Sequence, residues 1–364
     1  MSTLIAEARA RAASPAALIE KFRAHMAEHG LEIAGPVAES RIAFPGGAAM
    51  LRLEGGAIAL RIEAADADRL AEAKATVAGH LDALAPGEAL GIVWTGAGAP
   101  AGSLPHNFRA VRVLRAADVT PRMRRLTLGG RNLERFDAEM MHVKILIPAP
   151  GSAGAGPEGE PAWPRLDPSG QPVLDGCALT RRTYTIRRID AAAGELDIDF
   201  VLHGDGSPGS RFAMEAQPGD WLGLTGPGGG NVPVRGWTLI AGDETALPAI
   251  ARALEGMPPE ARGLAIIEVA DRAEEQALAH PSGVALRWLH RDGAPYGEML
   301  LQAVLAADWP EESEVSAWAA CESATARALR DHWGGERRLP RSHFRAVAYW
   351  RQGLAEGAGQ GEHD

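Results

Sequence analysis

The chain has 364 residues, and a typical domain size of about 100 to 200 residues predicts two to three domains. Its 37 basic and 47 acidic residues give a net charge of -10, which argues against general binding to nucleic acid or anionic membranes. The two cysteines, Cys177 and Cys321, are too few for a disulfide framework or a cysteine-ligated cluster, so we expect the reducing cytoplasm.

Residues 1–95 predict a small α+β domain. Glu7, Arg9 and Arg11 interrupt the N-terminus before a signal-peptide core could form, and no apolar run is long enough to span a membrane, so we expect no membrane insertion. The apolar spacing predicts helices over residues 15–30 and 66–84. Short alternating strands, three of them separated by paired-glycine turns that favour hairpins, are expected over residues 40–44, 49–54, 58–63 and 90–94.

The first predicted helix carries His25 and His29 in an H-x-x-E-H pattern around Glu28, which zinc hydrolases also use. Both histidines lie on one helical face, as metal ligation would require. Gly30 ends the helix at once, and cationic histidines are favoured at a helix C-terminus without any metal. We therefore interpret the pattern as a coincidence and expect no metal site.

Residues 96–105 are rich in Gly, Ala and Pro without apolar periodicity, which is typical of a linker. Residues 106–232 contain closely spaced strands, expected over 109–114, 123–128, 143–148, 183–188, 196–203 and 221–225. This density of strands, with Gly and Pro turns, predicts a closed antiparallel β-barrel. A loop rich in Pro and Gly over residues 149–176 interrupts the strands, and a loop of that length is either functional or disordered.

Residues 233–353 alternate between strands and helices. Strands are expected over 237–241, 264–270, 284–290, 314–320 and 344–350, and helices are expected to begin at Thr245, Arg272, Tyr296 and Ser323. This alternation predicts an α/β domain with a parallel sheet, which binds ligands at the carboxyl ends of its strands. The tail over residues 354–364 is rich in Gly, Glu and Gln, and we expect it to be disordered.

The most informative motif is Arg-x-Tyr-Thr on the fourth predicted barrel strand, formed by Arg182, Tyr184 and Thr185. Alternate residues share a face of a strand, so the cation and the aromatic ring lie together. Arg182 would contact a phosphate, Tyr184 would pack along a flavin, and Thr185 could hydrogen-bond its ring. Gly209 and Ser210 open a short helix whose free N–H groups can hold a pyrophosphate. An exposed strand and an ordinary glycine turn are the alternatives.

These motifs together resemble the FAD-binding half of the siderophore-interacting proteins, a family of flavin reductases of ferric siderophores. The resemblance implies that residues 106–232 form an FAD-binding barrel of the ferredoxin-reductase type and that residues 233–353 form an NAD(P)-binding domain. His203, at the end of its strand, is similar to a family position near the cofactor, although a lone histidine is more often structural. Residues 1–95 resemble a domain of unknown function that is sometimes fused to this family, so the resemblance gives them no activity.

Residues 204–209 also satisfy the dinucleotide-binding pattern G-x-G-x-x-G. The helix that follows can extend only to about Ala216, because Pro218 and Gly219 break it. No acidic residue near positions 226–231 is present to bind a ribose. We therefore reject a Rossmann-type site at this turn and expect the FAD pyrophosphate at the helix start instead.

The first strand-to-helix turn of the α/β domain contains Gly242, Asp243, Glu244 and Thr245, and it is similar to an acidic Gly-Asp-Glu-Thr turn of the family. A nicotinamide nucleotide should lie at this turn. The two carboxylates would repel a phosphate placed directly on them, so the pyrophosphate must lie beside the turn, away from these two side chains. A pure helix-capping role is the alternative.

Two further segments resemble the family. Cys321 and Glu322 end a sequence similar to its Trp-Ala-x-Gly-Glu turn, with Cys321 in place of the glycine, so a thiol-bearing side chain would narrow or tune the nicotinamide approach. Tyr349 and Trp350 begin a sequence similar to the closing Tyr-Trp-Arg-x-Gly, which places an aromatic residue near the flavin. A packed C-terminal strand is the alternative for this last segment.

The resemblance implies that NAD(P)H delivers a hydride to FAD, and that the reduced flavin passes single electrons to Fe(III) held by a small-molecule siderophore. Hard oxygen ligands favour Fe(III), so its reduction weakens the complex and releases ferrous iron. This chemistry requires no catalytic side chain, and the sequence has no Ser-His-Asp or paired-carboxylate constellation. The implied cofactors are FAD with NADPH or NADH, and the oligomeric state stays open.

An anionic ferric siderophore needs local positive charge in this acidic chain. Arg187 and Arg351 are assigned to substrate binding, and the further cations that could serve are Arg122, Arg124, Lys144 and Arg341. For the nucleotide, Arg272 or Arg291 could bind a 2′-phosphate, whereas Asp271 would favour a free 2′-hydroxyl. The resemblance alone favours NADPH.

Two other functions fit the sequence. A general NAD(P)H:acceptor flavin reductase would use a quinone, free flavin or small redox protein, and a small redox protein would need a docking face rather than a basic pocket. A non-catalytic siderophore- or flavin-binding protein would use the N-terminal unit as its binding module. Such a carrier would hold a flavin that NAD(P)H cannot bleach.

Overall fold

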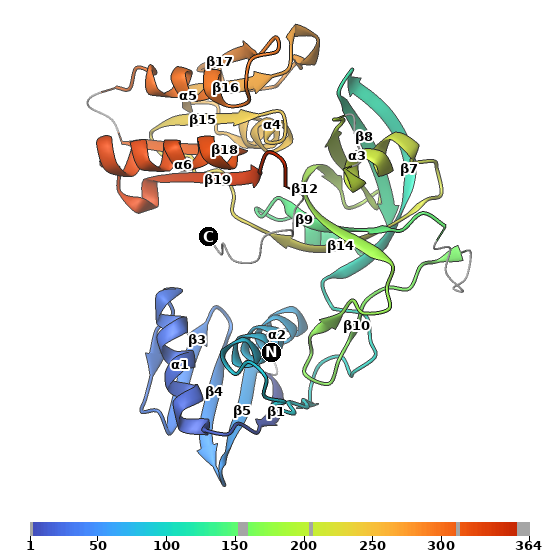
Figure 1. Cartoon of the computed structure of the whole chain (residues 1–364), viewed down its shortest axis with the longest axis vertical. Helices are drawn as coiled ribbons and strands as arrows, with labels where there is room; N and C mark the ends of the chain where they lie inside the picture. Colours follow the sequence, from blue (N-terminus) through green and yellow to red (C-terminus); the bar gives the residue numbers. More distant parts are fainter. Residues whose placement is uncertain (1–2, 152–158, 204–206, 311–313, 355–364) are drawn as a thin grey trace. The chain divides into compact units, whose positions relative to one another are not determined.

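The computed structural model describes residues 3–151, 159–203, 207–310 and 314–354 (Figure 1). Its contacts divide the chain into two compact units, the first containing residues 1–108 and 152–178 and the second containing residues 109–151 and 179–364. The expected disordered tail beyond Leu354 and the start of the glycine-rich turn, at residues 204–206, lie outside the described residues. None of the described helices is long and apolar enough to cross a membrane.

The first unit is an antiparallel sheet with two helices packed on one face (Figure 1). The sheet order is β2-β3-β4-β5-β1-β6. Its strands are β1 (Leu4–Ala10), β2 (Ile33–Ala34), β3 (Glu39–Phe44), β4 (Gly47–Glu54), β5 (Ala57–Ala64) and β6 (Thr95–Gly96). The helices α1 (Pro15–Glu28) and α2 (Ala67–Leu84) bury residues such as Phe22 and Leu70 against the sheet. This core gives the unit its own hydrophobic interior.

Local sequence signals explain these elements. The turn between β4 and β5 has positive φ angles at Gly55 and Gly56, +59° and +78°, as a two-residue hairpin turn requires. Asp66 accepts a hydrogen bond from the backbone N–H of Arg69 at 2.9 Å and so caps α2 at its first turn. The strand expected over residues 90–94 is wrong: these residues form no ladder, and pairing with β1 occurs only at β6.

The loop expected over residues 149–176 leaves the barrel and, from residue 159 on, packs into the first unit. It contains a short ladder between β10 (Arg165–Leu166) and β11 (Pro172–Val173). Trp94 Nε1 donates to the Ser169 carbonyl at 2.7 Å, and the rings of Phe108 and Trp163 lie 5.2 Å apart. The loop was expected to be either functional or disordered. Its described residues are ordered, so disorder does not apply to them.

The second unit begins with a closed barrel of strand order β12-β13-β8-β7-β14-β9 (Figure 1). The strands are β7 (Phe108–Thr120), β8 (Met123–Gly130), β9 (His142–Pro148), β12 (Leu179–Asp190), β13 (Glu195–Val201) and β14 (Trp221–Gly228). Inward-facing residues such as Ile145, Ile186, Ile198 and Phe200 fill its interior. The helix α3 (Pro208–Glu215) adds Ala213 to this core.

A parallel five-stranded sheet completes the second unit, with the order β17-β16-β15-β18-β19. Its strands are β15 (Trp237–Asp243), β16 (Arg262–Val269), β17 (Gly283–His290), β18 (Val315–Glu322) and β19 (Phe344–Trp350). The chain builds outward from β15 to β17 and then returns to add β18 and β19 on the other side. The switch point therefore lies between β15 and β18, where such sheets bind ligands.

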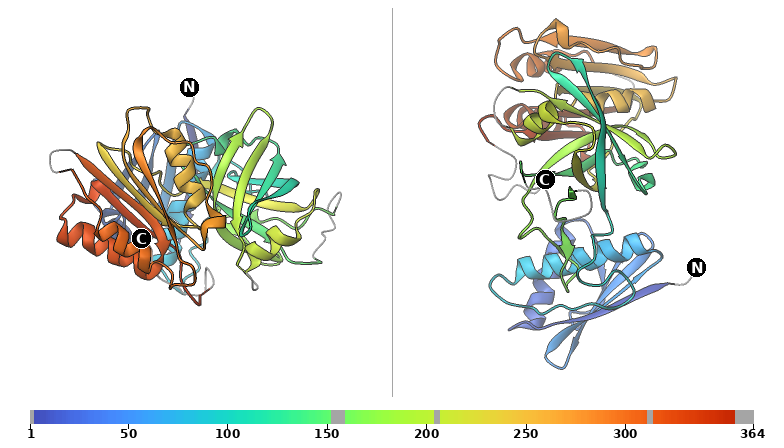
Figure 2. Two further views of the ribbon diagram at one scale, coloured as in Figure 1. Left: turned by 90° about the horizontal axis from the view of Figure 1, so that it is seen from above. Right: turned by 90° about the vertical axis from the view of Figure 1, so that its right-hand side faces the viewer.

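Helices cover both faces of this sheet. The helix α4 (Leu247–Gly256) packs on the face that also meets barrel residues such as Met123 and Met141, and Figure 2 shows it between the sheet and the barrel. The helices α5 (Glu298–Leu305) and α6 (Ser323–Asp331) pack on the opposite face. The helix expected from Arg272 is only a 3-10 turn over Arg272–Glu274. These elements confirm the expected fold class.

Candidate functional site

The two flavin motifs of the sequence come together on the barrel. Tyr184 lies on β12 with its ring 4.4 Å from that of Phe200, and its hydroxyl lies against Gly209 at the start of α3. A Cβ atom at Gly209 would collide with the Tyr184 hydroxyl and ring. Glycine at this position therefore lets the helix start approach the aromatic strand.

The start of α3 is built from buried small residues. Ser210 is buried, and its hydroxyl donates to the His203 carbonyl at 3.3 Å, which ties the helix to the end of the β13 segment. Ser207, the N-cap, makes no side-chain capping bond, so the first N–H groups of the helix receive no cap from that side chain. Arg182 is half-buried on β12, and the guanidinium donates to the Arg181 carbonyl at 2.7 Å.

These residues fit a flavin nucleotide. Gly209 provides a close backbone approach, the helix start provides N–H donors for an anion, and Arg182 provides a cation on the same barrel segment. Thr185 is buried at the end of the motif. The donor set is therefore of the kind that a pyrophosphate and a flavin ring require.

A residue that the sequence analysis missed, His142, connects this strand to the sheet domain. Its Nδ1 is 3.3 Å from Thr185 Oγ1, and its Nε2 is 3.0 Å from the Tyr349 hydroxyl. Burial, followed by the positive charges of Arg345, Arg252 and Lys144, lowers the pKa of His142 to about 4. The ring is therefore neutral at physiological pH. Thr185 and His142 are paired only through the β12–β9 register, so no local sequence signal indicates His142.

At the switch point, Asp243 joins three strands of the sheet. Its carboxylate accepts hydrogen bonds from Thr245 N at 2.9 Å, Thr245 Oγ1 at 2.5 Å, Glu322 N at 3.1 Å and Trp350 Nε1 at 2.8 Å. Burial and the neighbouring charge of Glu244 raise its pKa to about 6. The carboxylate is thus directed into the protein, where it holds the turn together. It does not cap α4, whose N-cap residue is Ala246 without a side-chain capping bond.

Gly242 of the acidic turn and two residues at the end of β18 also have close neighbours. A Cβ atom at Gly242 would collide with Ala246 and with the Ala320 carbonyl, so only glycine fits there. Glu322 caps α6 by accepting from Ala324 N at 2.5 Å. Cys321 is buried among the residues that face α5 and α6. The thiol expected to narrow the nicotinamide approach therefore points into that core, away from the sheet face covered by α4.

Glu244 and Arg291 form a bidentate ion pair, with distances of 2.7 and 2.5 Å. Arg291 is buried, stacks 4.2 Å over the Tyr296 ring and also donates to Glu268 at 3.3 Å. Two carboxylates therefore neutralise this arginine. Arg272, the other candidate for a 2′-phosphate, is exposed.

The two substrate-binding candidates differ in their surroundings. Arg187 forms a bidentate ion pair with Glu255 of α4, at 2.9 and 2.5 Å, and so holds the barrel against the sheet domain. Arg351 follows β19 and is exposed. The remaining candidate cations also have neighbours: Arg122 with Asp271 (4.0 Å), Arg124 with Asp118 (2.6 Å), Lys144 with Thr183 (2.5 Å) and Arg341 with the Phe344 ring (5.8 Å).

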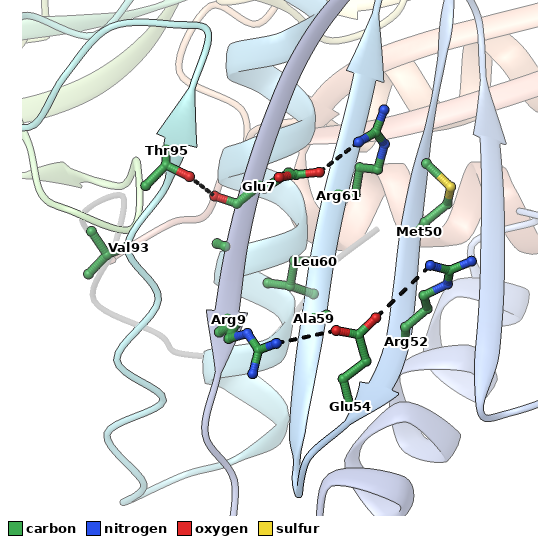
Figure 3. A pocket seen from close by; sticks show the side chains of 11 residues that line it. Glu7, Arg9, Met50, Arg52, Glu54, Ala59, Leu60, Arg61, Val93 and Thr95 are labelled. Atoms are coloured by element: carbon green, nitrogen blue, oxygen red, sulfur yellow. Dashed lines mark hydrogen bonds and ion pairs between the residues drawn. The ribbon is translucent and has the colours of Figure 1, made fainter.

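A separate hollow of about 660 Å³ lies on the solvent side of the first unit's sheet (Figure 3). Arg9 contacts Glu54 at 3.3 Å, and Arg61 contacts Glu7 at 2.6 Å, so the charges that line it pair with one another. None of its lining residues belongs to the barrel or to the parallel sheet. We therefore do not assign the flavin or the nucleotide to this hollow.

Comparisons with known proteins match three successive segments of the chain. Residues 112–231 match the family described as the siderophore-interacting FAD-binding domain, and residues 235–353 match the siderophore-interacting protein family. Residues 7–95 match a family described as an uncharacterized protein conserved in bacteria. The three matches follow the order of the N-terminal domain, the barrel and the parallel sheet.

Individual relatives share the same region. The ferric vibriobactin reductase ViuB of Vibrio cholerae is 34% identical over 259 residues, covering 69% of this chain and 92% of ViuB. The NADPH-dependent ferric-chelate reductase of Escherichia coli is 31% identical over 253 residues, covering 67% of this chain and 92% of the relative. The crystal structure of a siderophore utilization protein from T. fusca aligns with a TM-score of 0.61 and 38% identity, covering 70% of this chain and 97% of that one.

A closed barrel with a matching FAD-binding domain, followed by a parallel sheet, defines an FAD-dependent oxidoreductase. More particularly, the chain belongs to the siderophore-interacting protein family. Residues 7–95, in the N-terminal domain, match a different family, which is described as uncharacterized.

Proposed function

We propose that this protein is a ferric-siderophore reductase that takes electrons from NAD(P)H, with NADPH the favoured donor. The observation that carries the proposal is the meeting of Tyr184 with Gly209 at the start of α3, because it unites the flavin motifs on one surface. The names of the relatives, a ferric vibriobactin reductase and an NADPH-dependent ferric-chelate reductase, support the substrate class and the donor.

FAD, when bound, accepts a hydride and releases electrons one at a time. The residues of the chain would bind and orient it. The N–H groups at Gly209 and Ser210 would hold the pyrophosphate, Arg182 would neutralise a phosphate, and Tyr184 would lie along the ring. Thr185, hydrogen-bonded to neutral His142, would fix the position of the ring edge.

The turn over residues 242–245 and the ends of β18 and β19 would bound the nicotinamide site. Asp243 would act there by fixing the turn, since its carboxylate already accepts from Thr245, Glu322 and Trp350. Tyr349 and Trp350 would close the site from the last strand. Arg351, exposed just beyond them, would attract the anionic ferric chelate.

A reductase assay with a strong Fe(II) chelator as trap tests this function. Purified protein with FAD, NADPH and a ferric siderophore should produce trapped Fe(II) at a rate proportional to enzyme concentration. Omitting FAD or NADPH should abolish it. A protein that reduces quinones or free flavin but leaves the ferric siderophore intact would instead be a general flavin reductase, and one that oxidises no NADPH or NADH would be a binding protein.

A further inference from the structure

Three histidines meet where the two helices of the first unit pack together. His25 and His29 lie one turn apart at the end of α1, and His80 lies on α2. His25 Nε2 is 3.1 Å from His80 Nδ1 and 3.3 Å from His29 Nε2. The ring centroids are separated by 4.6, 4.9 and 5.9 Å. The three rings thus form one cluster, and His80 is a member that the H-x-x-E-H pattern did not include.

Hydrogen bonds between the rings cannot satisfy both contacts of His25 Nε2 at once. Both neighbours direct a ring nitrogen at the same atom, His25 Nε2. A nitrogen of a neutral imidazole either donates one hydrogen or accepts along one lone pair. His25 Nε2 can therefore form a good hydrogen bond to one neighbour only. A cation bound among the three rings would remove the conflict, because each nitrogen would then direct its lone pair at the ion.

The spacing agrees with metal coordination. Nitrogen ligands at about 2.0 to 2.1 Å from a tetrahedral Zn²⁺ lie about 3.3 to 3.4 Å from one another, close to the 3.1 and 3.3 Å between these nitrogens. Glu28 Oε2 lies 4.0 Å from His25 Nδ1. A carboxylate near the second ring nitrogen is the usual partner that keeps the first nitrogen available to a metal.

One ring must move to complete the site. As they stand, no three His, Cys, Asp or Glu side chains among the described residues could hold a metal ion. The widest gap in the cluster is the 5.9 Å between the rings of His29 and His80. His29 is the C-cap residue of α1 and is exposed, so its ring can turn without disturbing the core. A rotation of this ring toward His80 would bring the third nitrogen to the ion.

We propose that His25, His29 and His80 bind one divalent transition-metal ion of the Zn²⁺ type, with water completing its coordination. Imidazole nitrogens suit Zn²⁺, Ni²⁺, Cu²⁺ and Co²⁺ rather than Mg²⁺ or Ca²⁺. The site lies in the domain of the uncharacterized family and does not depend on the proposed reductase activity. A bound metal would give the H-x-x-E-H pattern a function, in place of the coincidence expected from the sequence.

Equilibrium dialysis of the untagged full chain against Zn²⁺ at pH 7.5 tests the proposal. One ion should bind per chain, and His25→Gln or His80→Gln should weaken binding by about tenfold or more. His280→Gln, which changes a histidine outside the cluster whose Nδ1 lies near the Pro281 carbonyl, is the matched control and should bind like wild type. Co²⁺ bound in place of Zn²⁺ should give the intense visible absorption of a four-coordinate ion.

Protonation and folding provide independent readouts. Binding should weaken as the solution is made acidic, because protonated imidazoles cannot ligate a metal. Zn²⁺ should raise the unfolding temperature of wild type and His280→Gln relative to EDTA, but not that of His80→Gln. Failure of wild type to bind a stoichiometric ion would overturn the proposal, as would wild-type affinity in folded His25→Gln and His80→Gln. Should those variants not fold, the exposed-site variant His29→Gln decides in the same way.

Discussion

The Tyr349 hydroxyl lies 3.0 Å from His142 Nε2, which joins the last strand of the parallel sheet to the first residue of barrel strand β9. The other nitrogen of the same ring faces Thr185 of the flavin motif. Burial raises the pKa of Tyr349, so its hydroxyl stays protonated. One neutral histidine therefore links the flavin motif to the closing aromatic motif.

The stability that His142 contributes should depend on pH. Its pKa is lowered to about 4, whereas a histidine in the unfolded chain titrates near 6.5. Between these values the unfolded state binds more protons, so this contribution is complete above about pH 6.5 and is lost as the pH falls toward 4, by up to about 3 kcal/mol. Urea unfolding of wild type and His142→Gln between pH 4.5 and 7.5 should show the two stabilities converging at low pH. Stability curves of the two proteins that stay parallel over this pH range would contradict the prediction.

Asp243 should show the opposite pH dependence. Its pKa is raised to about 6 from an ordinary value of 3.8, so the folded state retains a proton that the unfolded chain has released. This contribution is present below about pH 4 and is lost as the pH rises through about 6, by up to about 3 kcal/mol. Asp243→Asn cannot ionise and should lose this part of the pH profile in the same urea experiment. An unchanged slope in the variant would exclude the assignment.

The contact between Gly209 and Tyr184 should control FAD affinity. Gly209→Ala places a Cβ against the tyrosine hydroxyl, and we expect the FAD dissociation constant to rise by about tenfold or more, about 1.4 kcal/mol. Adding Tyr184→Phe removes the obstructing oxygen and should restore part of the affinity. Gly256→Ala, which adds a Cβ to open space on α4, is the control. Isothermal titration calorimetry measures the FAD affinity of all three variants. Wild-type FAD affinity in Gly209→Ala would show that this contact does not control FAD binding.

The choice between NADPH and NADH should depend on Arg272 rather than Arg291. Arg272 is exposed, and Arg272→Ala should raise the KM for NADPH by about tenfold, the effect of about 1.4 kcal/mol of lost binding, while leaving that for NADH unchanged. Arg291→Gln would leave Glu244 and Glu268 without their buried partner and should destabilise the fold by about 3 to 5 kcal/mol. A stable Arg291→Gln protein that has lost only its NADPH preference would reverse this assignment.

The two arginines proposed for substrate binding should behave differently. Arg351→Ala should raise the KM for the ferric siderophore with little effect on stability, because its side chain is exposed. Arg187→Ala should lower stability, because Glu255 then loses a bidentate partner at the junction of β12 and α4. Steady-state kinetics and thermal unfolding of both variants separate these effects. An unchanged KM in Arg351→Ala would remove this residue from the substrate site.

Sequence periodicity predicted most of the fold because the strands of the barrel and of the parallel sheet carry large apolar residues. The strand β1 was missed because its buried positions are Ala6, Ala8 and Ala10, whose small side chains give a weak alternating signal. Leu90 and Ile92 led to the opposite error, a strand predicted where none forms. Both side chains are buried, but the backbone at these residues pairs with no strand.

The candidate site could be predicted only where its residues lie close together in the sequence. The Arg-x-Tyr-Thr strand and the turn over residues 242–245 are local motifs, and both could be recognised. His142 could not, because its contacts with Thr185 and Tyr349 depend on strand register and on how the sheet packs against the barrel. The pairing of Arg291 with Glu244 likewise joins residues that are distant in the sequence.

The flow of electrons through bound FAD is tested most directly by anaerobic absorbance spectroscopy. Protein reconstituted with FAD would be titrated with NADPH, then separately with NADH, and finally mixed with a ferric siderophore. We expect the nucleotide to bleach the flavin and the ferric complex to restore its colour as Fe(II) appears. A tightly bound flavin that neither nucleotide bleaches, or a reduced flavin that the ferric complex does not reoxidise, would contradict it.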